Sequence, residues 1–221
     1  MNYKIIDLSH CVADGTVTYK GLPPPVISDF WSREYSAQFY DDDTSFHIAR
    51  IDMVVNTGTY IDVSFHRFND GYDLAGTPIE KLANLEGICF YSPFEDQLEI
   101  KPDLFVKMEL KNKAVLFNTG WSKKWGREEY QWNHPFLGKE AAEFLVSQEP
   151  IIVGIDSCNI DDTSGKSRPV HSILLKHGIL IVEHLCNLDS LKDQNFKFFG
   201  IPPKIKGAGS FPIRAFAIID S

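Results

Sequence analysis

Short apolar runs alternate along the chain with polar segments that contain glycine or proline. Runs rich in Ile, Val and Phe predict strands, and apolar residues at helical spacing predict helices. The predicted strands lie at residues 5–9, 87–91, 113–118, 151–155, 179–183 and 213–219, and the predicted helices at 139–147 and 169–177. A strand–loop–helix–strand order therefore occurs twice, from 113 to 155 and from 151 to 183, which predicts a mixed α/β layer.

The first third of the chain is less regular. GLPPP at 21–25 is typical of a loop or polyproline-like segment, and residues 28–47 are aromatic and acidic without a clear period. Residues 48–66 favour strand, interrupted at 57–59, and would add antiparallel strands to the layer. Because no repeat, low-complexity tract or linker divides the sequence, we predict a single domain over residues 1–221.

Composition narrows the class of protein. The 221 residues are 43% hydrophobic and 24% charged, as in an ordinary globular protein with a substantial core. The net charge is −8 and there is no run of Lys and Arg, so neither nucleic acid nor an anionic membrane is an expected partner. The four cysteines form no C-x-x-C pair, which argues against a disulfide framework. Without a signal-like or membrane-spanning apolar segment, a cytoplasmic protein is expected.

The segment from Asn56 to His66 is the first candidate for chemistry. If it is extended, side chains alternate between its two faces. One face then carries an acid, an imidazole and other polar groups: Asn56, Tyr60, Asp62, Ser64 and His66. Such a face could line a reactive site, but it is equally typical of a half-exposed strand with its polar face in water.

His171 and Glu183 form the second candidate. Pro169 suits the first turn of a helix and Gly178 suits its end. A helix packed antiparallel to the strand that follows it would bring His171 and Glu183 to the same end of the layer. Glu183 ends an apolar strand, where a carboxylate needs a cation or a donor, unless the strand end is simply exposed.

Asp62, His66, His171 and Glu183 together are oxygen and nitrogen ligands of the kind that zinc or manganese takes. A divalent ion held there would lower the pKa of a bound water and polarise a carbonyl. A histidine at its edge could act first as a general base and then as an acid toward the leaving group.

Residues 56–66 resemble the motif H-x-G-T-H-x-D-x-P-x-H of the kynurenine formamidases (arylformamidases), isatin hydrolases and related cyclases. The resemblance continues along nearly the whole chain. Its further segments are IDLSH at 6–10, GLPPP at 21–25, FHRFNDGYDL at 65–74, NTGW at 118–121, GIDSCNID at 154–161, the run from His171 to Glu183, and KIKGAGSFPIRAFAI at 204–218.

This resemblance implies a fold, an assembly and a set of roles. The fold would be α/β, a swivelling β/β/α-type domain with a mixed, antiparallel-rich sheet, assembled as a homo-oligomer (dimer or tetramer). Asp62, His171 and Glu183 would be metal ligands and His66 the catalytic acid/base. Tyr19 lies near the position of a substrate-stacking aromatic, and Asn56 and Ser64 would also contact a small-molecule substrate.

Two departures from the motif bear on the metal. Asn56 and Tyr60 stand where the family has the histidines of a first metal, and Ser64 replaces the motif proline. An amide oxygen and a phenol are poorer zinc ligands than imidazole, which argues against a two-zinc site. The site could hold one ion through Asp62, His171 and Glu183, could favour manganese or magnesium, or could work without metal while Tyr60 donates a hydrogen bond to an oxyanion.

The sequence therefore predicts a metal-dependent hydrolase that cleaves an amide, formamide, lactam or lactone bond of a small, aromatic molecule. Two alternatives stay open. One is a catalytically silent relative that binds a small molecule and has lost its metal, which the residues at 56 and 60 favour. The other is a lyase or cyclase that uses the same acid/base chemistry. A serine hydrolase is not expected, because the chain has no G-x-S-x-G sequence.

Overall fold

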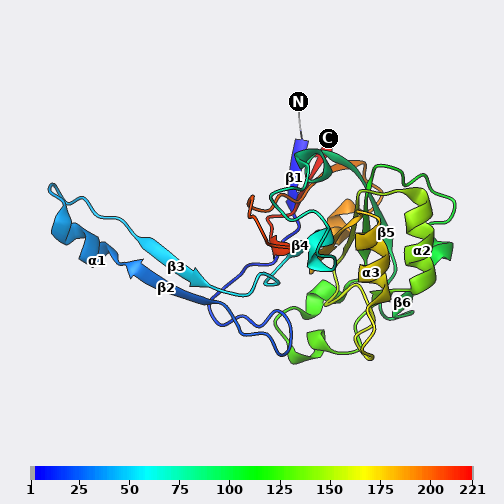
Figure 1. The fold of residues 1–221 in the computed structure, drawn as a ribbon, viewed down its shortest axis with the longest axis horizontal. Coiled ribbons are helices and arrows are strands. Elements are labelled where there is room, and N and C mark those ends of the chain that lie inside the picture. Colours follow the sequence, from blue (N-terminus) through cyan, green and yellow to red (C-terminus); the bar gives the residue numbers. More distant parts are fainter. Residues whose placement is uncertain (1–2, 221) are drawn as a thin grey trace.

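The apolar runs form a large curled sheet in the computed structural model, which describes residues 3–220 (Figure 1). In this part of the chain the sheet has nine strands in the order β1-β13-β11-β5-β7-β9-β10-β4-β12. Their bounds, in that order, are Tyr3–Asp7, Phe216–Asp220, Phe196–Phe199, Leu85–Tyr91, Ala114–Asn118, Ile152–Ile155, Leu180–Glu183, Tyr60–Asp62 and Ser210–Pro212.

The centre of the sheet is parallel and its flanks are antiparallel. β5, β7, β9 and β10 run parallel, while β1, β13, β11, β4 and β12 join antiparallel. Helix α2 (Lys139–Gln148) connects β7 to β9, and α3 (Pro169–Lys176) connects β9 to β10. The predicted mixed α/β sheet, rich in antiparallel pairs, is therefore confirmed, as are both predicted strand–helix–strand units.

The central strands are buried on both faces, which explains their continuous apolar character. On one face Val115 and Phe117 of β7 pack with Leu145 of α2 and Leu174 of α3. On the other, Leu116 packs in a second cluster that includes Ile61, Val182 and Phe198. The four cysteines are free thiols.

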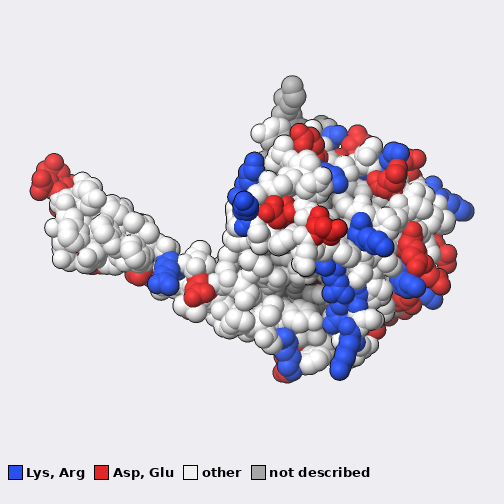
Figure 2. Space-filling model, in the orientation of Figure 1, with Lys and Arg blue, Asp and Glu red and all other residues white. Residues whose placement is uncertain are grey.

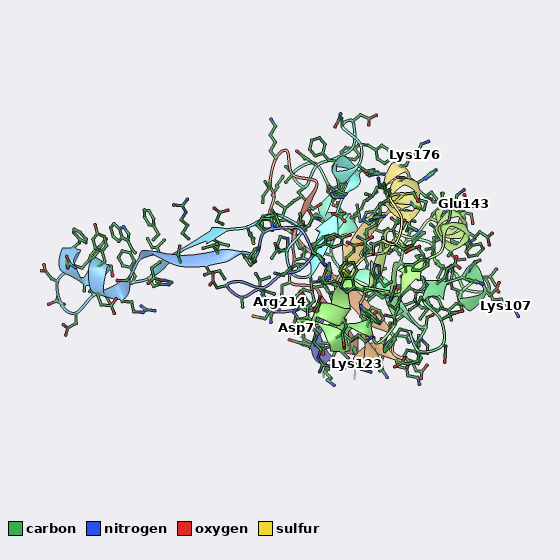
Figure 3. The ribbon with its side chains drawn as sticks, turned by 90° about the horizontal axis from the view of Figure 1, so that it is seen from below. Asp7, Lys107, Lys123, Glu143, Lys176 and Arg214 are labelled. Carbon is green, nitrogen blue, oxygen red and sulfur yellow. The ribbon has the colours of Figure 1, made fainter. Side chains whose placement is uncertain are left out.

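An arm formed by residues 26–52 extends away from the rest of the chain (Figure 1). It consists of β2 (Val26–Trp31), helix α1 (Arg33–Ser36), the 3₁₀ turn η1 (Ala37–Phe39) and β3 (Ile48–Asp52), with β2 and β3 paired antiparallel. The sequence predicted strand only for the end of this segment. Figure 3 shows from a second direction that the arm stands clear of the body.

The remaining elements are short. β6 (Glu99–Ile100) pairs with β8 (Phe136–Leu137). The 3₁₀ turns are η2 (Ser64–His66), η3 (Ile79–Lys81), η4 (Pro102–Leu104), η5 (Trp121–Lys124), η6 (Glu128–Gln131) and η7 (Leu188–Leu191). No helix within residues 3–220 is both long and apolar enough to cross a membrane.

Candidate active site

Three neighbouring strands bring acidic and hydroxyl side chains together at one edge of the sheet. Glu183 at the end of β10 lies opposite Tyr60 of β4, and Asp62 of β4 lies opposite Ser210 of β12. Strand residues directly opposite each other point to the same face, so these four side chains share one side of the sheet. All four are buried.

His171, in the first turn of α3, completes the cluster. Its Nδ1 is 2.6 Å from Asp161 Oδ2, and the same carboxylate accepts from the backbone N–H groups of Val170 and His171 at 2.7 and 3.0 Å. Asp161 thus accepts hydrogen bonds from N–H groups at the start of the helix, which have no partner within the helix, and it also orients the His171 ring. Nε2 of His171 then lies 3.6 Å from both Asp62 Oδ2 and Glu183 Oε1.

The ionisation of this cluster follows from burial and charge. Burial lowers the pKa of His171, but its hydrogen bond to Asp161 and the nearby carboxylates of Asp62 and Glu183 outweigh burial and raise the pKa to about 10. Burial raises the pKa of Glu183 to about 7, although the positive charge of His171 opposes the rise. The cluster is therefore a set of carboxylates closed around one imidazole.

Tyr60 and Asn56 donate to the carboxylates from the other side. The Tyr60 hydroxyl donates to Glu183 Oε2, and the Asn56 amide donates to Asp62 Oδ1 at 3.4 Å. Burial first, and then the charges of Glu183 and Asp62, raise the pKa of Tyr60 well above its usual value. Tyr60 therefore keeps its proton and acts as a donor.

Ser210 links Asp62 to His66. Its hydroxyl donates to Asp62 Oδ1 and lies 2.8 Å from His66 Nδ1. Because the single hydroxyl proton of Ser210 goes to the carboxylate, Nδ1 of His66 carries the proton that it donates to Ser210. Nε2 of His66 is then left with a free lone pair, on a side chain that is 34% exposed. This is the arrangement of a general base held by a buried acid.

The residues present fit one divalent cation. Asp62 Oδ2 is buried and accepts no hydrogen bond from the part of the chain that the structure describes, and unpaired buried carboxylate oxygens are costly. Ligand atoms about 2.1 Å from a tetrahedral zinc lie roughly 3.4 Å apart, close to the 3.6 Å from His171 Nε2 to Asp62 Oδ2 and to Glu183 Oε1. Within residues 3–220, the group whose ligand atoms all lie within 4.8 Å of one another is Asp62, His66 and His171, so it differs from the predicted ligand set by His66 in place of Glu183.

Comparisons with known proteins show the family of the chain. Residues 6–162 match the sequence profile of the family described as "Putative cyclase". The chain belongs to this family. Kynurenine formamidases of Bacillus cereus (strain ATCC 14579) and Bacillus mycoides (strain KBAB4) are each 27% identical to this cyclase-family chain, over 210 and 216 residues, and each match covers 95% of both chains.

Solved structures share the fold of this cyclase-family chain. Isatin hydrolase A from Labrenzia aggregata, bound to benzyl benzoate, superposes with a TM-score of 0.84 at 20% identity, covering 99% of this chain and 94% of that one. A structure described as a potential metal-dependent hydrolase with cyclase activity has a TM-score of 0.78 at 23% identity and covers both chains completely.

One sequence-predicted site residue of this family member, Ser64, points away from the cluster. Ser64 does not share the face of Asp62, because β4 ends at Asp62 and residues 64–66 form the turn η2. Its hydroxyl donates instead to the Leu175 carbonyl at 3.0 Å. Tyr19 is half-buried and packs against the cluster of Trp121 and Tyr130. The prediction that one extended face carries all five polar residues is wrong in this respect.

Asp161 and Ser210 are site residues that we did not predict from the sequence. Both lie inside segments that resemble the family, GIDSCNID and KIKGAGSFPIRAFAI, but neither has a spacing that ties it to Asp62 or His171. The only available signal was that polar residues directly follow or interrupt apolar runs at these two places.

A second buried polar group lies beside Tyr60. The His184 ring is 5.3 Å from the Tyr60 ring, and its Nδ1 is 2.9 Å from the Tyr130 hydroxyl. The His10 ring stacks on Trp125 at 4.2 Å. Within residues 3–220, Nε2 of His10 and Nε2 of His184 have no hydrogen-bond partner. Burial lowers the pKa of His10 to about 4 and that of His184 to about 3, so both rings are neutral at physiological pH.

Proposed function

We propose that the chain is a hydrolase that cleaves an amide, formamide, lactam or lactone bond of a small aromatic molecule. The observation that carries this proposal is the connection from Asp62 through Ser210 to His66, which leaves a basic nitrogen at the edge of a buried acidic cluster. The similar proteins support it, since they include kynurenine formamidases and isatin hydrolases.

The proposed reaction uses His66 twice. Nε2 of His66 accepts a proton from water as the water oxygen attacks the carbonyl carbon. The tetrahedral adduct then collapses, the bond from that carbon to nitrogen or oxygen breaks, and His66 gives its proton to the leaving atom. A formamide or open-chain amide gives an acid and an amine, whereas a lactam or lactone gives one ring-opened molecule that carries the acid together with the amine or alcohol. Asp62, acting through Ser210, stabilises the imidazolium that forms between the two steps.

Asp62, His171 and Glu183 would hold one divalent ion, zinc or manganese, in this proposal. When bound, such an ion polarises the carbonyl and lowers the pKa of water. The unpaired Asp62 Oδ2 and the two 3.6 Å spacings support a single ion. A second ion would need ligands at positions 56 and 60. Asn56 and Tyr60 instead donate hydrogen bonds to the carboxylates of Asp62 and Glu183.

The remaining roles concern the substrate. Tyr60 keeps its proton, and it would donate a hydrogen bond to the developing oxyanion by turning its hydroxyl away from Glu183 Oε2. Asn56 lies beside Asp62 and offers a polar contact. Aromatic rings gather nearby, with Trp125 5.5 Å from His184 and Tyr19 against Trp121 and Tyr130, which supports a planar ligand.

The test pairs metal analysis with a substrate panel of arylformamides, aromatic lactams and aryl lactones. Changing His66→Ala should lower kcat/KM by about 10²–10⁴ while the bound metal stays at one ion per chain. Asp62→Ala should lose both activity and metal. His177→Ala is the matched control and should change neither, because it removes an exposed histidine whose Nδ1–H donates to the Ile173 carbonyl of its own helix. Unchanged activity in His66→Ala would refute the proposal.

A small-molecule-binding protein without catalysis is the second candidate. The hydrogen bonds from Tyr60 and Asn56 favour it, because they satisfy carboxylate oxygens without any ion. In that case metal analysis finds no ion, the panel shows no turnover, and calorimetry still detects saturable binding of a panel compound that the Tyr60→Phe change weakens.

A further inference from the structure

Three basic side chains stand beside the candidate active site without an acidic partner. Arg67 directly follows His66, and Lys166 and Arg168 lie in the loop that leads into α3. Within residues 3–220 none of the three forms an ion pair with a carboxylate. Because the chain has 30 acidic and 22 basic residues, unpaired cations gathered in one place need an explanation.

Arg67 reaches from one site histidine to the other. Its Nε donates to Ser172 Oγ at 3.2 Å, and Ser172 directly follows His171 in α3. The rings of His66 and His171 are themselves 5.9 Å apart. A guanidinium has several N–H donors in a fixed fork, and in the described part of the chain only the Nε donor of Arg67 has a partner. The terminal N–H groups of Arg67 are therefore free beside the two histidines.

Arg168 is fixed by the loop in which it lies. Its Nη1 donates to the carbonyl oxygens of Asp162, Gly165 and Ser167 at 3.2, 2.9 and 2.7 Å. The Arg168 carbonyl oxygen accepts from Ser172 Oγ at 3.0 Å, so one serine joins both arginines. Arg168 is half-buried, and a cation in such a position is costly unless an opposite charge lies beside it.

The acids of this region are engaged elsewhere. Asp162 accepts from the backbone N–H and the hydroxyl of Ser164, with one carboxylate oxygen each and both at 2.8 Å. Asp161 is buried and bonded to α3 and to the His171 ring. Figure 2 shows basic side chains lined up beside a hollow in this face of the molecule, below the position of α3 in Figure 1. The described residues thus leave these cations without a counter-charge of their own.

Two explanations fit unpaired cations at this place. They could offset the buried charge of the acidic cluster, or they could bind an anion that arrives from solvent. Asp62 and Glu183 are completely buried, whereas Arg67 and Lys166 are exposed. Water screens an exposed cation from buried acids, while an anion that enters past His66 meets the guanidinium donors directly. Only the second explanation gives the free N–H groups of Arg67 a partner.

We propose that the substrate carries a carboxylate on its aromatic part, and that Arg67 and Arg168 bind this carboxylate at the entrance of the site. The planar fork of a guanidinium matches a carboxylate with two parallel hydrogen bonds. A singly charged group fits better than a phosphate dianion, because the buried acids repel a double charge more strongly. Lys166 adds to the attraction without a fixed contact.

This inference rests on the proposed function and narrows its substrate class to carboxylated aromatic amides, formamides, lactams or lactones. The bound carboxylate takes no part in the reaction. For a carboxylated formanilide, water attacks the formyl carbon, the bond from that carbon to nitrogen breaks, and the nitrogen takes up the proton from His66. The products are formate and an aminobenzoate. The arginines therefore bind and orient the substrate, while His66 handles the proton.

The first experiment compares the 2-, 3- and 4-carboxyformanilides with the corresponding nitroformanilides. A nitro group has the shape of a carboxylate but no net charge. In Arg67→Gln the ratio of kcat/KM between the carboxyl and the nitro compound should fall at least about tenfold for the preferred isomer, since a charge-assisted contact is lost. The different reactivity of the two compounds cancels, because each is compared with the wild type. Arg67→Lys keeps the charge and should recover part of the ratio.

Lys176→Gln is the matched control, because it removes an exposed positive charge at the other end of α3. It should leave the ratio as it is in the wild type. Raising the salt concentration from about 20 mM to about 500 mM should lower kcat/KM of the wild type more for the carboxyl than for the nitro compound. An equal loss for both compounds in Arg67→Gln, or a loss of bound metal, would overturn the proposal and assign Arg67 to the support of the acidic cluster.

Calorimetry of the same compounds separates this inference from the hydrolase proposal. If no compound is turned over, the hydrolase proposal fails. The carboxylate site still stands in that case if the wild type binds a carboxyl compound at least about tenfold more tightly than its nitro counterpart and Arg67→Gln removes the preference. Turnover of the panel without any preference for the carboxyl compounds would leave the hydrolase in place and overturn the carboxylate site.

Discussion

The Ser210 hydroxyl decides which nitrogen of His66 can act as a base. With its proton donated to Asp62, it can only accept from Nδ1 of His66, and so Nε2 keeps the lone pair. A serine does this without adding charge to a cluster that already contains three buried acids and one imidazole. In the proposed reaction Ser210 positions His66 and does not itself react.

Changing Ser210→Ala should therefore lower kcat and leave the bound metal in place. Without the hydroxyl, nothing fixes the His66 tautomer, and we expect kcat to fall by about 10–100-fold, the usual cost of losing an orienting partner. Ser210→Thr keeps the hydroxyl and should restore most of the activity. Steady-state kinetics with metal analysis of each variant would check this. Loss of metal in Ser210→Ala would show instead a structural role around Asp62.

His10 makes the folded chain sensitive to acid. Its pKa is about 4 in the folded chain, mainly through burial, against an ordinary value of 6.5. Between pH 6.5 and 4 the unfolded state binds more protons, so stability falls as the pH falls. The full shift corresponds to about 3.4 kcal/mol, and solvent screening of this half-buried ring reduces it to roughly 1–2 kcal/mol.

The change His10→Phe should make stability less dependent on pH. A phenyl ring can keep the stacking on Trp125, and the unpartnered Nε2 loses no hydrogen bond. Urea unfolding at pH 7 and pH 4.5 should show a difference that is about 1–2 kcal/mol smaller than in the wild type. His177→Asn, at an exposed histidine, serves as the control. An unaltered difference in His10→Phe would mean that His10 is not a source of acid sensitivity.

Sequence patterns identified part of the site for a clear reason. Asp62, His171 and Glu183 lie on β4, at the start of α3 and at the end of β10, so their proximity follows from regular element lengths. Ser210 reaches Asp62 only through the pairing of β12 with β4, across 148 residues of sequence, which no local spacing reveals. The prediction for Ser64 failed because β4 ends at Asp62, so the alternation of side chains between two faces does not continue to residue 64.

At the scale of elements, the start of α3 depends on one carboxylate. Pro169 provides the first turn, but the Arg168 side chain makes no cap hydrogen bond. Asp161, ten residues before His171, accepts from two backbone N–H groups and from the His171 ring. An aspartate that is 1% exposed and has three charge-assisted hydrogen bonds couples helix formation to the orientation of the site.

Changing Asp161→Asn should destabilise the fold by about 2–4 kcal/mol. The amide NH2 of asparagine would replace one carboxylate oxygen, so at least one of the N–H groups that donate to Asp161 would lose its acceptor. The denaturation midpoint in urea would measure this. Asp162→Asn, at the exposed neighbouring residue, is the matched control and should cost under about 1 kcal/mol. Equal effects of the two changes would contradict the special role of Asp161.

The regular elements were largely predictable, whereas the arm was not. The strands and helices from residue 85 onward carry periodic apolar residues because they pack on a core. In the arm, residues 28–47 are aromatic on every side and show no period, because little of that segment packs against the chain itself.

At the scale of the whole molecule, the charges of the body are largely balanced locally. Arg214, in the segment before β13, lies beside Asp7 of β1 (Figure 3). Its Nε and Nη2 donate to the two Asp7 carboxylate oxygens at 2.9 and 2.6 Å, next to the pairing of β1 with β13. The acidic cluster around Asp62 is the exception. Asp62, Asp161 and Glu183 are buried with one buried histidine, His171. The excess negative charge of this cluster destabilises the folded state.

A divalent ion should therefore stabilise the whole fold. An ion that binds only the folded state contributes about 2.7 kcal/mol when its concentration is a hundred times its dissociation constant. For a chain of this length each kcal/mol raises Tm by about 2–4 °C, so stripping the metal with a chelator should lower Tm by roughly 5–10 °C. Calorimetry of stripped protein, then of protein reloaded with Zn²⁺ or Mn²⁺, would measure the shift. The Tm of the Asp62→Asn variant should change with neither chelator nor metal. The control variant Asp7→Asn should respond to both as the wild type does. A stripped wild type with an unchanged Tm would argue that the cluster closes without an ion.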